Sequence, residues 1–201
     1  ISRTEVAPVL YEKHPERNDA IPAVSKVRRH IVEAREERLK AYSNVCPWNY
    51  EEMHDTKIGI VASGAAYMYA KDVFGDKASY FKVGLSYPMP VEKIRAFREK
   101  VDELYVIEEL DPYMEEILRT AGIDCHGKDV IPKIDELNPN IIAEAVLGTT
   151  REFNDVPQDL LVPRPPTFCA GCPHRGFFYA LSKRKDTVMI GDIGCYALGG
   201  A

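Results

Sequence analysis

Three of the five cysteines lie in the C-terminal part of the chain, as Cys169-Ala-Gly-Cys172 followed by Cys195. A Cys-x-x-Cys turn lets two thiolates bind one metal centre, and a third thiolate can close on the same centre. Iron–sulfur clusters usually take four thiolates, so a fourth ligand has to lie elsewhere. The spacing alone is equally compatible with free thiols that lie beside a glycine-rich turn and bind no metal. A thioredoxin-like redox pair is a weaker alternative, because a Pro-rich stretch precedes the motif.

A glycine-containing turn, Gly191-Asp192-Ile193-Gly194-Cys195, follows a short apolar run. Peptide N–H groups in such a turn can hold a phosphate. Gly191, Asp192, Gly194 and Cys195 are therefore candidate cofactor-binding residues. The alternative is a tight turn that binds no ligand.

His174 and Arg175 come directly after Pro173 and shortly before a predicted helix. Near a helix start these side chains could contact an anionic cofactor, so His174 is a further candidate. A histidine at such a place is also commonly a structural residue.

Paired carboxylates, Glu108 and Glu109, follow a predicted strand and could act as acid–base groups. They could equally cap a helix or face solvent, which is the interpretation we favour. Ser63-Gly64 ends another predicted strand and could bind an anion at a helix start. No Gly-x-Gly-x-x-Gly pattern follows it, so a dinucleotide site is not predicted.

Strand and helix patterns alternate over residues 57–148. Right-handed crossovers between such elements give a parallel sheet, so this segment predicts one three-layer α/β/α domain. The predicted strands cover 57–63, 79–85 and 104–107. The predicted helices cover 65–74, 111–118 and 139–147, with a further one starting at residue 90.

The remaining segments differ in character. Residues 1–56 read as a connector that contains one amphipathic helix over about 22–44. Residues 149–166 read as a Pro-rich linker. Residues 167–201, with a predicted helix over 176–183 and strand over 187–190, read as the truncated start of a second α/β domain.

Composition limits the classes of function. The net charge is −5 and the pI about 5.6, which disfavours a nucleic-acid partner. No apolar stretch is long enough to span a bilayer, and no signal peptide opens the chain. With an odd number of cysteines, these features predict a cytoplasmic protein without disulfides.

The motifs together resemble a known family. The string from Arg164 through Cys169-Ala-Gly-Cys-Pro-His174 to Leu181, and then Gly191-Asp-Ile-Gly-Cys-Tyr-Ala-Leu-Gly199, resemble the start of the thiamine-diphosphate domain of 2-oxoacid:ferredoxin oxidoreductases. The resemblance is strongest to the alpha subunits of indolepyruvate ferredoxin oxidoreductases. Residues 57–148 resemble the transketolase-C-terminal-like domain of the same subunits. We therefore expect an internal fragment of such a subunit.

The resemblance implies an enzyme that oxidatively decarboxylates aryl pyruvates with coenzyme A and reduces ferredoxin. It implies thiamine diphosphate, Mg and a 4Fe-4S cluster as cofactors, and a beta subunit and ferredoxin as partners. The carbon chemistry belongs to the cofactor, which the protein holds and activates.

Residue by residue, the resemblance makes Cys169, Cys172 and Cys195 candidate cluster ligands. It places the turn from Gly191 to Cys195 near the cofactor diphosphate. The usual Gly-Asp-Gly…Asn metal motif is absent, since Ile193 follows Asp192, and we expect it beyond residue 201. The isolated fragment is therefore expected to be inactive. The alternative function is a non-catalytic subunit-docking α/β module whose cysteines form a structural metal knuckle.

Overall fold

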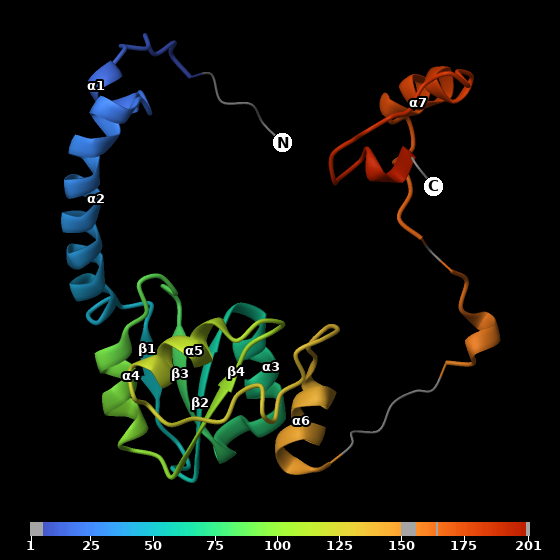
Figure 1. Ribbon diagram of the computed structural model, residues 1–201. Helices are drawn as coiled ribbons and strands as arrows, with labels where there is room; N and C mark the ends of the chain where they lie inside the picture. Colours follow the sequence, from blue (N-terminus) through green and yellow to red (C-terminus); the bar gives the residue numbers. More distant parts are fainter. Residues whose placement is uncertain (1–5, 150–155, 164, 200–201) are drawn as a thin grey trace. The chain divides into compact units, whose positions relative to one another are not determined.

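The chain consists of two compact units, residues 1–151 and 152–201. The computed structural model describes residues 6–149, 156–163 and 165–199 (Figure 1).

The first unit is built on one four-stranded sheet. Its strands are β1 (Tyr50–Glu52), β2 (Ile58–Ser63), β3 (Ser79–Val83) and β4 (Glu103–Ile107), in the order β1-β3-β2-β4. β2 pairs in parallel with both β3 and β4, while β1 pairs antiparallel with β3. Ile60, for example, lies between Tyr80 and Tyr105 in this register. The predicted parallel sheet is confirmed, and β1 is an addition that the sequence patterns did not predict.

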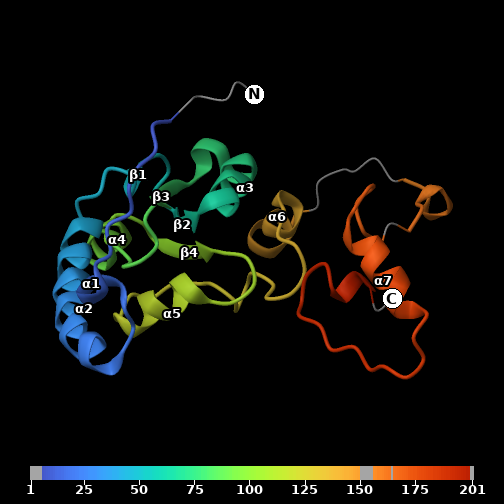
Figure 2. The ribbon, with the colours of Figure 1, turned by 90° about the horizontal axis from the view of Figure 1, so that it is seen from above.

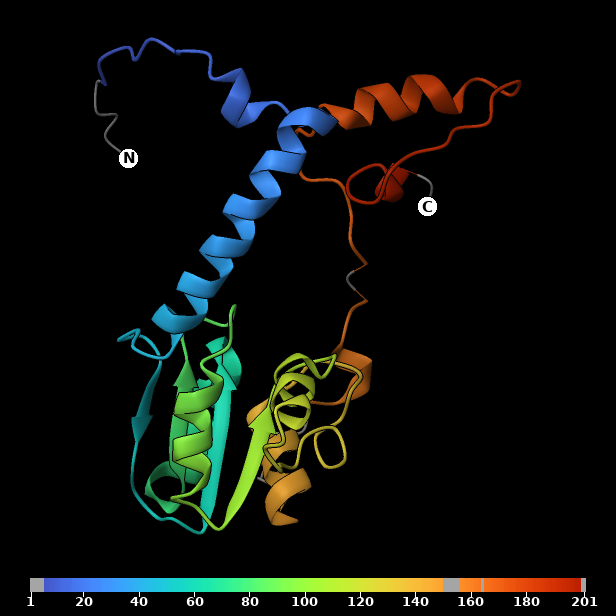
Figure 3. The ribbon, with the colours of Figure 1, turned by 60° about the vertical axis from the view of Figure 1, so that its left-hand side comes forward.

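Helices cover both faces of this sheet, as Figures 2 and 3 show. On one face, α4 (Val91–Arg98) and α5 (Tyr113–Thr120) bury Ile94, Phe97 and Leu118 against the sheet. On the other, α3 (Gly64–Phe74) and α6 (Pro139–Leu147) bury Ala70 and Ile142. Two apolar cores therefore lie on opposite sides of the strands, which confirms the predicted three-layer α/β/α architecture.

The helix ends follow from local sequence. Asn138 caps α6, since its Oδ1 accepts hydrogen bonds from the backbone of Asn140 and Ile141 at 3.0 and 3.1 Å. Gly148, directly after α6, has φ of 64°, a left-handed conformation that favours glycine.

A long helix precedes the sheet. α1 (Pro15–Asn18) leads into α2 (Pro22–Ser43), which confirms the helix predicted over this segment. The last turn of α2 is fixed to the domain, since Ser43 is buried and Asn44 Oδ1 accepts a hydrogen bond from the Lys93 amide at 3.2 Å. The apolar side chains Val27 and Ile31 stay 65% and 59% exposed.

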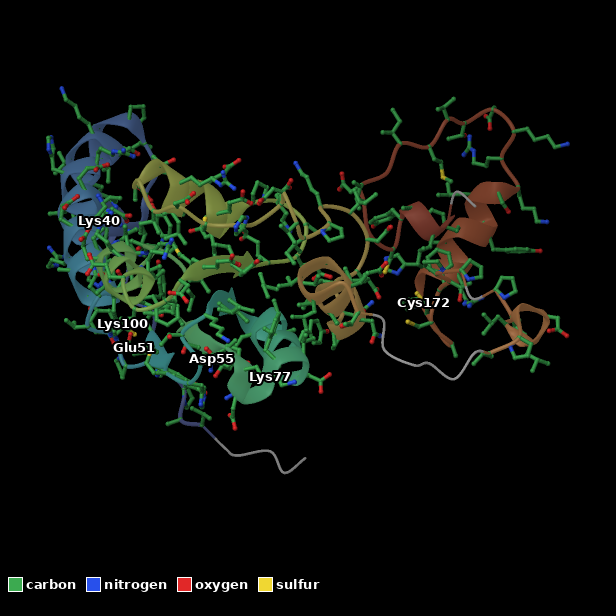
Figure 4. All side chains as sticks on the ribbon, turned by 90° about the horizontal axis from the view of Figure 1, so that it is seen from below. Lys40, Glu51, Asp55, Lys77, Lys100 and Cys172 are labelled. Atoms are coloured by element: carbon green, nitrogen blue, oxygen red, sulfur yellow. The ribbon has the colours of Figure 1, made fainter. Side chains whose placement is uncertain are left out.

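The edge strand β1 is held by charges as well as by the ladder. Lys100 and Glu51 form an ion pair with 2.5 Å between Nζ and Oε1, and both residues are labelled in Figure 4. On the other side of β1, Glu52 accepts hydrogen bonds from Lys71 Nζ at 2.6 Å and from the Tyr67 hydroxyl. These contacts attach a strand of only three residues to α3 and to the turn that follows α4.

The described residues of the second unit hold α7 (His174–Ser182), two 3-10 helices (Gln158–Leu160 and Ala197–Gly199) and no strand. The helix predicted in this segment is confirmed, beginning two residues earlier than expected. The strand predicted over 187–190 is wrong: Val188 and Ile190 are 89% and 96% exposed, with no neighbouring strand among the described residues. A strand needs a paired neighbour to be stable, and this unit offers none in its described part.

Candidate functional site

The Cys-x-x-Cys motif forms a tight turn at the start of α7. The Cys172 amide donates to the Cys169 carbonyl at 3.2 Å, and Gly171 between them has φ of 71°. Cys172 Sγ lies 3.4 Å from His174 Nδ1, so a thiol and an imidazole are in contact. Figure 4 labels Cys172 in this segment. The turn is therefore preformed, and the left-handed conformation of Gly171 favours glycine at that position.

Arg175 is committed to this turn. Its guanidinium donates hydrogen bonds to the carbonyls of Cys169 at 3.1 Å and Phe168 at 2.5 Å. These bonds satisfy backbone acceptors before the helix. The side chain thus helps to close the turn, and the expectation that Arg175 could contact an anionic cofactor stays a prediction.

Aromatic rings connect α7 to the residues that follow the glycine turn. The ring of His174 is parallel to that of Phe168, with 6.4 Å between centroids, and perpendicular to that of Tyr196 at 5.4 Å. Phe178 also meets Tyr196 edge-on at 5.8 Å. His174, predicted as a cofactor-binding residue, thus has a packing role here and lies beside Tyr196, next to Cys195 in sequence.

The turn over 191–195 contains the glycines that the sequence singled out. Gly194 has φ of 124°, which only glycine adopts without strain, and its carbonyl accepts a hydrogen bond from the Ala197 amide at 3.1 Å. A Cβ on Gly191 would lie 3.1 Å from Cβ of Tyr196. Gly191 therefore permits close packing of the chain on itself.

An apolar groove of about 650 Å³ lies beside this turn. Its lining includes the predicted residues Gly191 and Asp192 together with Phe177, Phe178 and Tyr196. The structure thus brings the glycine turn and α7 around one groove whose walls are mainly apolar, with aromatic and aliphatic side chains.

The three cysteines predicted as metal ligands do not meet. Within residues 6–149, 156–163 and 165–199 there is no group of three or more His, Cys, Asp or Glu side chains that could hold a metal ion. Cys169 and Cys195 are exposed and Cys172 is half-buried. In this arrangement the described residues do not gather three thiolates for an iron–sulfur cluster, and the arrangement of the turn over 191–195 does not test its assignment to a diphosphate. Both assignments stay predictions.

A second set of candidates lies in the first unit, at the carboxyl end of β4. Glu108 is 8% exposed, and its carboxylate accepts hydrogen bonds from the amides of Met114 at 2.8 Å and Glu115 at 3.0 Å. Burial raises the pKa of Glu108, and the two backbone hydrogen bonds oppose that shift. The prediction that Glu108 caps a helix is therefore confirmed, because its carboxylate oxygens accept hydrogen bonds from backbone amides in the first turn of α5.

Neighbouring charges are also engaged structurally. Lys128 Nζ donates to the carbonyl oxygen of Glu108, and desolvation lowers the pKa of Lys128. Glu109 Oε1 accepts a hydrogen bond from the Leu137 amide at 2.8 Å. Sequence patterns grouped Glu108 with Glu109, and the structure shows that the two carboxylates stabilise different backbone segments.

Among the described residues, no helix combines the length and the apolar composition that crossing a membrane requires.

No family model matches the chain. Curated relatives do match it. Indolepyruvate oxidoreductase subunit IorA of Pyrococcus abyssi is 31% identical over 94% of this chain and 33% of its own length. The protein of the same name in Methanothermobacter thermautotrophicus is 34% identical over 94% of this chain and 35% of its own. The resemblance to this family is confirmed, and the chain spans about a third of the length of these relatives.

One solved structure is also similar, a 2-oxoglutarate:ferredoxin oxidoreductase from Magnetococcus marinus. The two sequences are 19% identical. The match covers 54% of this chain and 20% of the solved chain, with a TM-score of 0.36. A likeness this low carries no argument about the site.

Proposed function

We propose that this chain forms part of the alpha subunit of an indolepyruvate-type 2-oxoacid:ferredoxin oxidoreductase. The observation that carries the proposal is similarity over 94% of the chain to subunits of that name. The proposed substrates are an aryl pyruvate, such as indolepyruvate, and coenzyme A. Cleavage of the bond between C1 and C2 releases carbon dioxide, and the acyl group forms a thioester with the thiol. One proton is released, and two electrons pass to two molecules of ferredoxin.

The proposed cofactors are thiamine diphosphate with Mg and a 4Fe-4S cluster, which supply the carbon chemistry and the electron path when they are bound. Cys169, Cys172 and Cys195 are the proposed metal ligands. The proposed cofactor contacts are His174, Gly191, Asp192, Gly194 and Cys195. The described part of the chain does not gather the three thiols around one centre.

The role of the first unit follows from its packing. Both faces of its sheet are covered by helices, and its buried polar side chains all have hydrogen-bond partners in the described part of the chain. We propose that it serves as a rigid domain from which the Cys-x-x-Cys segment extends. A beta subunit and ferredoxin are the proposed partners.

A chimeric enzyme tests the proposed function. The matching third of the Pyrococcus abyssi subunit is replaced by this chain, and the product is co-expressed with the partner subunit. We expect viologen reduction that requires indolepyruvate and coenzyme A. An assembled chimera that is inactive with indolepyruvate but active with another 2-oxoacid would contradict the aryl-pyruvate assignment. Co-purification with the partner subunit separates that outcome from failure to assemble.

The isolated chain is the matched control. Because it spans about a third of its relatives, we expect no aryl-pyruvate-dependent dye reduction from it. Activity of the chain alone would show that the rest of the subunit is dispensable.

Metal analysis separates the enzyme from the alternative, a docking module with a structural metal knuckle. Iron and acid-labile sulfide in the anaerobically purified chimera favour the cluster. Stoichiometric zinc, with tetrahedral absorption after exchange with cobalt, favours the knuckle. The Cys172→Ser variant of the chimera should lose either metal.

A further inference from the structure

The loops after β2 and β4 diverge at the carboxyl edge of the sheet. These two strands are adjacent and parallel, with Ala62 opposite Ile107. The helix after β2, α3, covers one face, and the helix after β4, α5, covers the other (Figure 2). In open α/β sheets, such a reversal leaves a crevice between two strand ends, where ligands generally bind.

The structure has a cavity at this point. It measures about 290 Å³, just below the usual range of about 300–1,000 Å³ for small-molecule sites. Its lining comes from three successive strand ends and from both helices: Ser63, Ala65, Ala66, Ser86, Glu108, Glu109, Tyr113 and Met114. Sequence patterns pointed to Ser63 and the glutamate pair separately, and the cavity brings them together.

One wall of the cavity is small and rich in donors. Gly64 has φ of 54°, so a side chain at this position would strain the backbone. Ser63 precedes α3, and in the described structure its side chain accepts no capping hydrogen bond from that helix. The hydroxyl and the first amides of α3 are thus available to an anionic group.

The facing wall carries the negative charge. The oxygens of Glu108 are used by the α5 amides, and Glu109 is exposed, with one oxygen accepting from Leu137. A carboxylate accepts more than one hydrogen bond, so Glu109 retains capacity for a ligand donor. The tyrosine on this wall is fixed, because the Tyr113 hydroxyl donates to the Ser86 carbonyl at 3.0 Å.

Each wall also carries apolar groups, Ala65 and Ala66 in the first turn of α3 and Met114 in α5. Ala65, Ala66 and the buried Met114 offer methyl and thioether surface of a size that suits a short aliphatic side chain. A ligand that matches all three features has an anionic end, a cationic end and a small apolar branch.

We propose that this crevice binds a free aliphatic α-amino acid. Its carboxylate is held by Ser63 and the first turn of α3, its ammonium by Glu109, and its side chain by Ala65 and Ala66. All of the residues that line the site belong to the first unit, and the proposal is independent of the proposed oxidoreductase chemistry.

Calorimetric titration of the full chain with L-leucine tests the proposal. We expect saturable binding with a Kd of about 1 mM, a value typical of a small, shallow site. Isocaproate and isoamylamine, which lack the ammonium and the carboxylate respectively, should each bind about tenfold more weakly. Absence of saturable leucine binding, or equal binding of leucine and isocaproate, would overturn the proposal.

Three variants locate the site. Glu109→Gln keeps an oxygen for the Leu137 amide but loses the charge, and should weaken leucine binding about tenfold. Glu116→Gln changes an exposed carboxylate on α5 outside the cavity and should leave binding unchanged. Ala65→Leu, at an exposed helix position, should abolish binding while thermal unfolding stays close to wild type. Binding that survives both Glu109→Gln and Ala65→Leu would place leucine elsewhere and refute the assignment.

Discussion

The side-chain amide of Asn49 accepts a hydrogen bond from the backbone of Leu85 and also donates one to it. Its Oδ1 accepts from the Leu85 amide at 2.8 Å, and its Nδ2 approaches the Leu85 carbonyl at 3.4 Å. The same side chain also accepts from the Gly84 amide and donates to the Ser43 carbonyl, both at 2.9 Å. Asn49 is fully buried. One amide thus joins the end of α2, the start of β1 and the loop after β3.

Replacing Asn49 should therefore be costly. Asn49→Ala leaves several buried backbone groups without partners, and we expect it to lower the free energy of unfolding by about 2–3 kcal/mol. Urea denaturation followed by circular dichroism measures the change. Asn18→Ala, at an exposed position at the end of α1, is the control and should stay within about 0.5 kcal/mol of wild type. Equal effects of the two changes would show that Asn49 is not a structural joint.

Stability should depend on pH through Glu52. The hydrogen bond from Lys71, followed by that from Tyr67, lowers the pKa of this carboxylate below its ordinary value of 4.5. Because the folded pKa is depressed, the stabilisation is present above pH 4.5 and is lost as the pH falls through the folded value. We expect Glu52→Gln to cost about 1–2 kcal/mol at neutral pH.

The difference between wild type and Glu52→Gln should shrink when unfolding is measured at progressively lower pH. Glu116→Gln, which removes an exposed carboxylate, provides the comparison. A Glu52→Gln penalty that stays constant from neutral pH to well below 4.5 would rule out the ion pair as its source.

Gly59 should not tolerate a side chain unless its neighbour is reduced. A Cβ at this position in β2 would lie 2.6 Å from a methyl carbon of Val101, which is buried. Gly59→Ala should therefore destabilise the first unit by about 1–3 kcal/mol. Val101→Ala alone creates a cavity and should also be destabilising.

The double variant should be more stable than the sum of the two single changes predicts, because the new methyl group occupies the space left by valine. A thermal-unfolding double-mutant cycle measures this coupling. Strict additivity would mean that the strand shifts to accommodate the added methyl group and that the close contact does not limit the site.

The five cysteines should react with a thiol reagent at two different rates. Cys46 and Cys125 are buried, and desolvation raises the pKa of Cys125 to about 11, so few thiolates form near neutral pH. Cys169 and Cys195 are exposed and Cys172 is half-buried, so three thiols should react rapidly in the native chain. Absorbance after mixing with an aromatic disulfide counts the fast and slow groups. Slow reaction at all three C-terminal thiols, reversed by a chelator, would reveal a bound metal.

The alternating elements of the first unit were predictable because their signals are local. Apolar runs such as 58–63 mark buried strands, and glycines such as Gly75 and Gly148 follow the helices. The strand β1 was not predictable from Tyr50-Glu51-Glu52, since its pairing depends on Asn49 and on the distant partners Lys71 and Lys100.

For the candidate sites, sequence spacing identified chemical types but not their positions. Cys169 and Cys172 share a turn because they are close in sequence, whereas the place of Cys195 depends on the intervening chain. The strand predicted over 187–190 fails for the same reason, because an apolar run becomes a strand only beside a partner. Ser63 and Glu109 stand far apart in the sequence, and only the crossing of α3 and α5 to opposite faces places them at one cavity.

Neither edge of the sheet presents a long row of unpaired peptide N–H and C=O groups. Beyond β3 the ladder stops at β1, three residues long with adjacent glutamates, and beyond β4 the His126 backbone exchanges hydrogen bonds with Leu104 and Val106 at 2.8 and 2.7 Å. Unprotected outer strands recruit strands from other molecules and start aggregation. The short charged strand and the bridging loop therefore protect the first unit against polymerising through its backbone.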